Sequence, residues 1–118
     1  MRWLLHGNLT PAVGDALRRH GHSVEKLEEI GDMSELLKTA GTKKLDIITA
    51  DSELAEAPFA GGPRFGRSIV YLQLAGGDVE QDDAIDRLFK RYKRLTPGRL
   101  YTVTAARVKI RQLPTTHN

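Results

Sequence analysis

DIITADSEL, residues 46 to 54, places a short apolar segment directly before a helix start. Residues 46 to 49 predict a buried strand of the kind found in parallel sheets, and residues 52 to 57 predict a brief helix that Pro58 ends. Asp51 stands between the two, so its carboxylate should project from the carboxyl end of a central strand. Because ligands of open α/β sheets bind at these ends, Asp51 is a candidate functional residue.

Strands and helices alternate along the rest of the chain. Glycine and proline make residues 58–67 a predicted mobile surface loop, and Gly41 is predicted to stop a helix that Asp32 or Ser34 caps. The alternation predicts one α/β domain over residues 1–114, with a central, mostly parallel sheet, helices on both faces and a C-terminal β-hairpin, followed by a tail at 115–118. The other expected strands are 2–6, 24–27, 68–74, 100–104 and 108–113, and the other expected helices are 11–20 and 79–95.

The bulk composition describes a soluble globular domain. The chain has 118 residues, of which 40% are hydrophobic and 28% charged, so it can bury a core. It has no cysteine, which excludes disulfides and thiolate metal sites. With no visible signal peptide and no apolar run of membrane-spanning length, we expect no membrane partner and a cytoplasmic location. The formal net charge of +3 is compatible with a nucleic-acid partner.

Acidic residues at predicted helix starts are the candidate metal ligands. They are Asp51 and Glu53 at one helix and Asp32 and Glu35 at another. If two of these carboxylates lay about 4 Å apart, they would repel by roughly 4 kcal/mol at an effective dielectric near 20. A bound Mg²⁺ or Mn²⁺ would relieve that repulsion and could stabilise charge on a phosphate during hydrolysis. Ordinary helix capping is the alternative: it is the favoured interpretation for Asp32 and Glu35, a functional role is favoured for Asp51, and both stay open for Glu53.

Short motifs follow one another in a fixed order along nearly the whole chain: HGNLTP at 6–11, GHSV at 21–24, MSELLKTA at 33–40, TADSEL at 49–54, GRLYTV at 98–103 and RVKIRQLP at 107–114. In order and spacing they resemble a compact branch of the PIN-like nucleases associated with bacterial toxin–antitoxin systems. The resemblance implies a PIN-like α/β fold and cleavage of RNA that depends on Mg²⁺ or Mn²⁺. It also makes RNA, a cognate antitoxin and a second copy of the chain candidate partners.

Carried over residue by residue, the resemblance implies catalytic roles for Asp51, Glu35 and Glu53. Asp51 and Glu35 match acidic positions of the family, and Glu53 stands in place of an aspartate. Met33 occupies another expected aspartate position, with Asp32 one residue away. The implied metal ligands are therefore Asp51, Asp32 and Glu35, with His6 as a substitute ligand.

The chain departs from the family at its first motif. The leading carboxylate is replaced by His6 and the neighbouring glutamate by Gly7. His6 could bind Mn²⁺ or Zn²⁺, although imidazole suits Mg²⁺ poorly, or it could mark a degenerate site. The leading hypothesis is a toxin-type ribonuclease with a weakened or lost active site. The alternatives are a non-catalytic PIN-like protein that binds a protein partner or nucleic acid, and an unrelated small-ligand α/β domain, which no Walker pattern supports.

Basic residues near the C-terminus form the candidate nucleic-acid surface. Arg107, Lys109 and Arg111 alternate with apolar residues, which in a strand places the three cations on one face. Arg64 and Arg67 flank the glycine-rich loop and are further candidates for phosphate contacts. Cations on an edge strand also protect against aggregation, so a structural role is the alternative. We expect the cations at the end of the long helix to be solvated: Arg87, Lys90, Arg91, Lys93 and Arg94.

Overall fold

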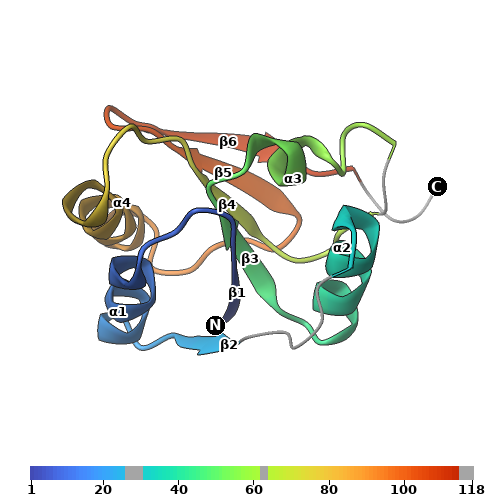
Figure 1. Ribbon diagram of the computed structural model, residues 1–118, viewed down its shortest axis with the longest axis horizontal. Helices are drawn as coiled ribbons and strands as arrows, with labels where there is room; N and C mark the ends of the chain where they lie inside the picture. Colours follow the sequence, from blue (N-terminus) through green and yellow to red (C-terminus); the bar gives the residue numbers. More distant parts are fainter. Residues whose placement is uncertain (26–30, 62–63, 115–118) are drawn as a thin grey trace.

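A six-stranded sheet organises the computed structural model, which describes residues 1–25, 31–61 and 64–114 (Figure 1). The strand order is β2-β1-β3-β4-β5-β6, parallel from β2 to β5, and β6 pairs antiparallel with β5. The predicted mostly parallel α/β sheet is confirmed, and residues 46–49 lie inside it as β3. The strands are β1 (Arg2–His6), β2 (Ser23–Glu25), β3 (Asp46–Thr49), β4 (Ile69–Leu72), β5 (Arg99–Val103) and β6 (Val108–Gln112).

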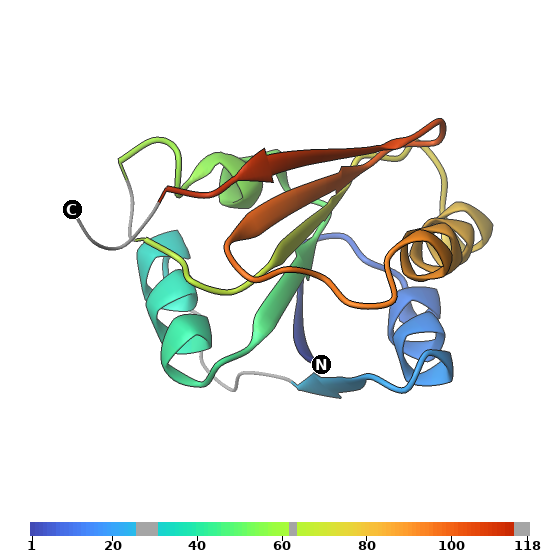
Figure 2. The same ribbon diagram turned by 180° about the vertical axis from the view of Figure 1, so that it is seen from behind.

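Helices cover both faces of the sheet, as predicted. On one side lie α1 (Pro11–Arg19) and α4 (Asp78–Arg91), and on the other lie α2 (Met33–Thr42) and α3 (Ser52–Glu56) (Figure 2). Two core clusters match these layers: Ile48 of β3 packs with α1 and α4, and its neighbour Ile47 packs with α2 and α3. Both isoleucines are fully buried because the side chains of a strand alternate between faces. Among the described residues, no helix combines the length and apolar character of a membrane span.

The helix starts partly follow the sequence signals. Thr10 is the N-cap of α1 and Pro11 occupies the first turn, but the Thr10 side chain makes no capping hydrogen bond. Instead, the Thr10 backbone N–H donates to Gln81 Oε1 of α4 at 2.9 Å, which ties α1 to α4. Asp32 rather than Ser34 caps α2, because its carboxylate accepts from the Glu35 backbone N–H at 2.9 Å.

Several predicted boundaries are wrong for tertiary reasons. Gly41 lies inside α2, which ends at Thr42 with Lys43 as its C-cap, and the next residue, Lys44, adopts a left-handed φ of 58°. Phe65 is 1% exposed in the core beneath α2 and α3, so the stretch 58–67 is not purely surface; residues 62–63 lie outside the described part. β4 is shorter than predicted at both ends. The predicted end of β2 at residue 27 and the tail at 115–118 also lie outside the described residues.

The largest boundary error concerns α4, which ends at Arg91 instead of Leu95. Tyr92 is extended, and its ring packs edge-on against Tyr101 at a centroid distance of 5.8 Å. Leu95 is 5% exposed in the core, and the following Thr96 N–H donates to Tyr101 Oη at 2.8 Å. Tyr101 thus holds the segment after α4 against the sheet. Lys93 and Arg94 consequently lie outside the helix.

His22 is held in its neutral form by the core. The fully buried Trp3 donates its indole Nε1–H to His22 Nδ1 at 3.1 Å. An indole N–H can only donate, so Nδ1 must carry a lone pair and the neutral ring carries its proton on Nε2. Burial lowers the pKa of His22 below its ordinary value of 6.5.

This lowered pKa predicts a loss of stability in mild acid. Because unfolded His22 takes up a proton more readily than folded His22, its contribution is fully present above pH 6.5 and declines as the pH falls from 6.5 toward the folded pKa. Urea unfolding at several pH values should therefore show a steeper loss for the wild type than for His22→Gln. Parallel curves for the two proteins would contradict this result, since other groups titrate equally in both.

Candidate functional site

A polar cavity of about 430 Å³ lies where β1 and β3 end and α3 begins. This is the carboxyl edge of the parallel strands, where the sequence places the candidate site. His6 and Asp51 both line the cavity, so the structure brings these two predicted residues together. The other lining residues are Gly7, Asn8, Ala50, Ser52 and Tyr71.

Thr49 contacts both His6 and the turn that carries Asp51. Its side chain is fully buried, its Oγ1 lies 2.9 Å from His6 Nδ1, and the same oxygen accepts the Asp51 backbone N–H at 2.9 Å. One hydroxyl therefore positions both the imidazole and the turn that carries Asp51. Gly7 closes the corner with φ of 82°, and a Cβ there would lie 3.4 Å from Thr49 Oγ1. This left-handed conformation favours glycine over glutamate.

The remaining predicted acids act at helix starts and do not line the cavity. Asp51 itself is the N-cap of α3, since its Oδ1 accepts from the Glu53 N–H at 2.9 Å. Asp32 caps α2 in the same way, and both Glu35 and Glu53 are exposed. For these residues the geometry fits capping, the alternative that the sequence left open.

The donor set at the corner does not fit a divalent metal centre. In the described ranges 1–25, 31–61 and 64–114, no three histidine or carboxylate side chains are arranged to hold a metal ion. Mg²⁺ and Mn²⁺ prefer several oxygen ligands, whereas this corner offers one carboxylate engaged in capping and one imidazole paired with a hydroxyl. The Mg²⁺ or Mn²⁺ site that the resemblance implies therefore lacks ligands here.

A line of paired residues runs across neighbouring strands from this corner to β6 at the edge of the sheet. His6 pairs with Thr49, Thr49 with Tyr71, Tyr71 with Thr102, and Thr102 with Lys109. These five residues, which we name the polar row, cross β1, β3, β4, β5 and β6 on the α3 side. At about 4.8 Å between strands, the row spans roughly 19 Å. Sequence reasoning missed Tyr71 and Thr102, because only cross-strand register connects them to the corner.

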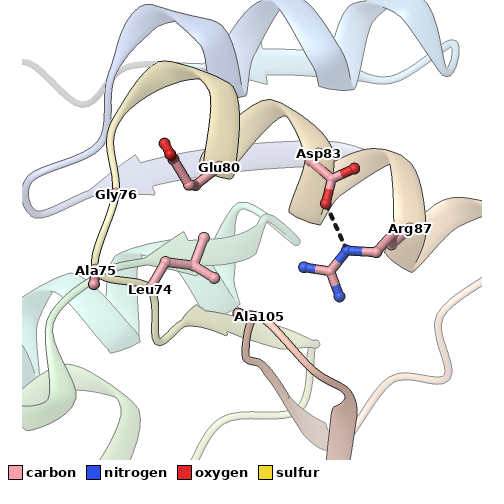
Figure 3. Close-up of a pocket in the computed structure, with 7 residues that line it drawn as sticks. All are labelled: Leu74, Ala75, Gly76, Glu80, Asp83, Arg87 and Ala105. Atoms are coloured by element: carbon pink, nitrogen blue, oxygen red, sulfur yellow. Dashed lines mark hydrogen bonds and ion pairs between the residues drawn. The ribbon is translucent and has the colours of Figure 1, made fainter.

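Two further cavities continue the carboxyl edge toward α4. One of about 360 Å³ shares Ala50 and Tyr71 with the polar corner. The next, of about 380 Å³, shares Leu74 and Ala75 with it and is partly closed by Arg87, whose Nε donates to Asp83 Oδ2 at 2.8 Å (Figure 3). The Arg87 Nη2 also donates to the Thr104 carbonyl at 3.1 Å, which holds the turn between β5 and β6. The carboxyl edge is thus hollowed from β1 to α4.

Three of the predicted nucleic-acid residues are engaged within the protein. Arg111 lies 2.9 Å from Glu56 and 3.9 Å above the Phe59 ring. Arg67 lies 3.2 Å from the buried Asp46 carboxylate, and Arg64 also contacts other groups. These contacts give Arg111 and Arg67 a structural role.

The predicted basic stripe is also shorter than the sequence pattern indicates. Arg107 precedes β6, in a turn that Thr104 closes, so the prediction of three cations on one strand face is wrong for this residue. Lys109 and Arg111 do share a face of β6 and are exposed, and Ile110 on the other face is 39% exposed. Lys109 is the cation of this group that belongs to the polar row.

Comparisons with known proteins do not show a family for this chain. No protein-family model matches the chain, and no curated protein matches it significantly.

Proposed function

We propose that this chain is a PIN-like domain of the toxin type that has lost its metal centre and binds single-stranded RNA without cutting it. The observation that carries the proposal is the polar row, which leads from the corner at His6 to the exposed Lys109. The replacement of the leading acid by His6, held by Thr49, supports the loss of metal-dependent chemistry.

Apart from the buried Thr49, the residue types of the row and the corner suit RNA. Imidazole, amide, hydroxyl and phenol groups can hydrogen-bond base edges and 2′-hydroxyls, which single-stranded RNA exposes. Tyr71 borders two of the cavities and offers a ring on which a base can stack. Lys109 at the far end can contact a phosphate, and the net charge of +3 favours association with a polyanion.

This proposal predicts RNA binding that depends on Tyr71 and Lys109. Fluorescence anisotropy with a short 5′-hydroxyl RNA should show about a tenfold weaker affinity for Tyr71→Leu, because stacking contributes about 1–3 kcal/mol per base. Lys109→Gln should weaken binding and reduce the salt slope by about 1. The matched control is Lys38→Gln, which removes an exposed lysine of α2 that is not in the polar row.

A cleavage assay with the same RNA distinguishes binding from catalysis. Incubation of the RNA with the protein and Mn²⁺ should leave the RNA intact. Mn²⁺-dependent cleavage that Asp51→Ala abolishes would contradict the proposal and support the ribonuclease hypothesis. Equal effects of the Lys109 and Lys38 variants would contradict the role of the row.

A further inference from the structure

A fourth cavity, of about 350 Å³, lies at the opposite, amino edge of the sheet. Its wall is formed by residues that precede strands: Met1 before β1, the turn before β2, Arg67 shortly before β4, and the segment after α4 that leads to β5. Three cations line it, Arg67, Lys93 and Arg94, together with His20 and His22, and no carboxylate is among the lining residues. A concave surface of this composition attracts anions and repels metal ions.

Arg67 is held in place at this cavity. Its Nη2 lies 3.2 Å from Asp46 Oδ2, and Asp46 is itself fully buried and accepts the Ser68 N–H at 2.9 Å. The Arg67 carbonyl accepts from the Gly98 N–H at 3.1 Å, so the backbone is fixed as well. The Arg67 Nε atom is buried without a hydrogen-bond partner. The Arg67 side chain as a whole is 33% exposed, so part of it stays accessible beside the cavity.

The early end of α4 supplies the other two cations. Because α4 ends at Arg91, Lys93 and Arg94 lie outside the helix. Both line the cavity beside the buried Leu95. His22 adds a donor, because its Nδ1 is occupied by Trp3 and its Nε2 carries the proton. His20 is paired through Nε2 with Asp86 Oδ1 at 2.8 Å, which orients that ring.

We propose that this amino-edge pocket binds a phosphate monoester dianion. Guanidinium and ammonium donors make short, charge-assisted hydrogen bonds to phosphate oxygens, and the arginine fork matches their geometry. The dianion could come from a free nucleotide or from the phosphorylated end of an RNA, which present the same chemistry. This pocket lies at the other edge of the sheet from the polar row, so the inference does not depend on the proposed function.

Isothermal titration with inorganic phosphate, pyrophosphate and a mononucleotide tests the pocket directly. Lys93→Gln/Arg94→Gln should weaken binding of these probes by about tenfold or more, since each 1.4 kcal/mol of lost interaction is a factor of ten. The matched control is Lys90→Gln/Arg91→Gln, which removes the same charge from exposed residues of α4 that do not line the cavity. Arg67→Lys keeps the charge but loses the fork and should weaken binding without orphaning Asp46.

The source of the phosphate is resolved by comparing 5′-phosphorylated and 5′-hydroxyl RNA of one sequence. Tighter binding of the phosphorylated strand, lost in the Lys93/Arg94 variant, would support the pocket and assign it to RNA ends. Binding of the small phosphates without that difference would support the pocket and assign it to free nucleotides. Absence of saturable binding by every probe, or equal losses in the two double variants, would overturn the proposal.

Discussion

Replacing Asp46 with alanine should lower the free energy of unfolding by about 3 kcal/mol, because it leaves a partly buried arginine without its counterion. Asp46 is fully buried at the start of β3, and its two oxygens are engaged by Arg67 and by the Ser68 N–H at 3.2 and 2.9 Å. Without this carboxylate, Arg67 and the Ser68 N–H would both lose their acceptor at the point where the chain enters β4. For a domain of this size the melting temperature should fall by roughly 10 °C.

An exposed ion pair provides the control for this prediction. Arg2 pairs with Glu25, but the two side chains are 51% and 37% exposed, so Glu25→Ala should cost less than about 1 kcal/mol. Urea unfolding of both variants gives the comparison, and Asp46→Asn, which retains an acceptor for Ser68, should lie between them. A loss for Asp46→Ala no larger than that for Glu25→Ala would contradict the structural role of this carboxylate. It would also weaken the view that Arg67 is fixed at the amino-edge pocket.

A strand was predictable where consecutive residues of its own segment indicate it. Residues 46–49 form β3 with the predicted bounds, because two consecutive isoleucines buried on both faces are typical of an interior parallel strand. The end of α4 was not predictable in this way. Tyr92 and Leu95 continue the apolar stripe of a helix, and the tertiary contacts of Tyr92 and Thr96 with Tyr101 in β5 explain why the chain leaves it.

The candidate site was predictable in position and not in composition. Asp51 and His6 share one cavity because the carboxyl ends of β1 and β3 are neighbours in the sheet. The sequence could not decide between capping and metal binding for Asp32 and Glu35, since both roles place carboxylates at helix starts. The polar row depends on the register between strands, and the amino-edge pocket depends on where α4 ends and the strands begin. The periodicity of apolar residues in the sequence predicts neither.

His6→Asp, which places a carboxylate where the PIN-like motif that the sequence resembles has its leading acid, should create weak metal binding at the carboxyl edge. In His6→Asp a second carboxylate would lie beside Asp51, and Mn²⁺ should then raise the melting temperature of the variant but not of the wild type. Without metal, the variant should be less stable than the wild type, because it loses the contact with Thr49 and adds an anion near another. Differential scanning fluorimetry with and without Mn²⁺ measures both effects, and adding Asp51→Ala should abolish the stabilisation by metal.

A further change, Gly7→Glu, should be harmful even though the PIN-like motif that the sequence resembles has a glutamate at this position. Gly7 has φ of 82°, a conformation that costs a residue with a Cβ about 1–2 kcal/mol, so His6→Asp/Gly7→Glu should be less stable than His6→Asp without metal. RNA cleavage should remain absent in His6→Asp, because Asp32, Glu35 and Glu53 do not line the cavity. Stabilisation of the wild type by Mn²⁺ would show that a metal centre survives, whereas cleavage by His6→Asp would show that the other acids reach this corner in solution.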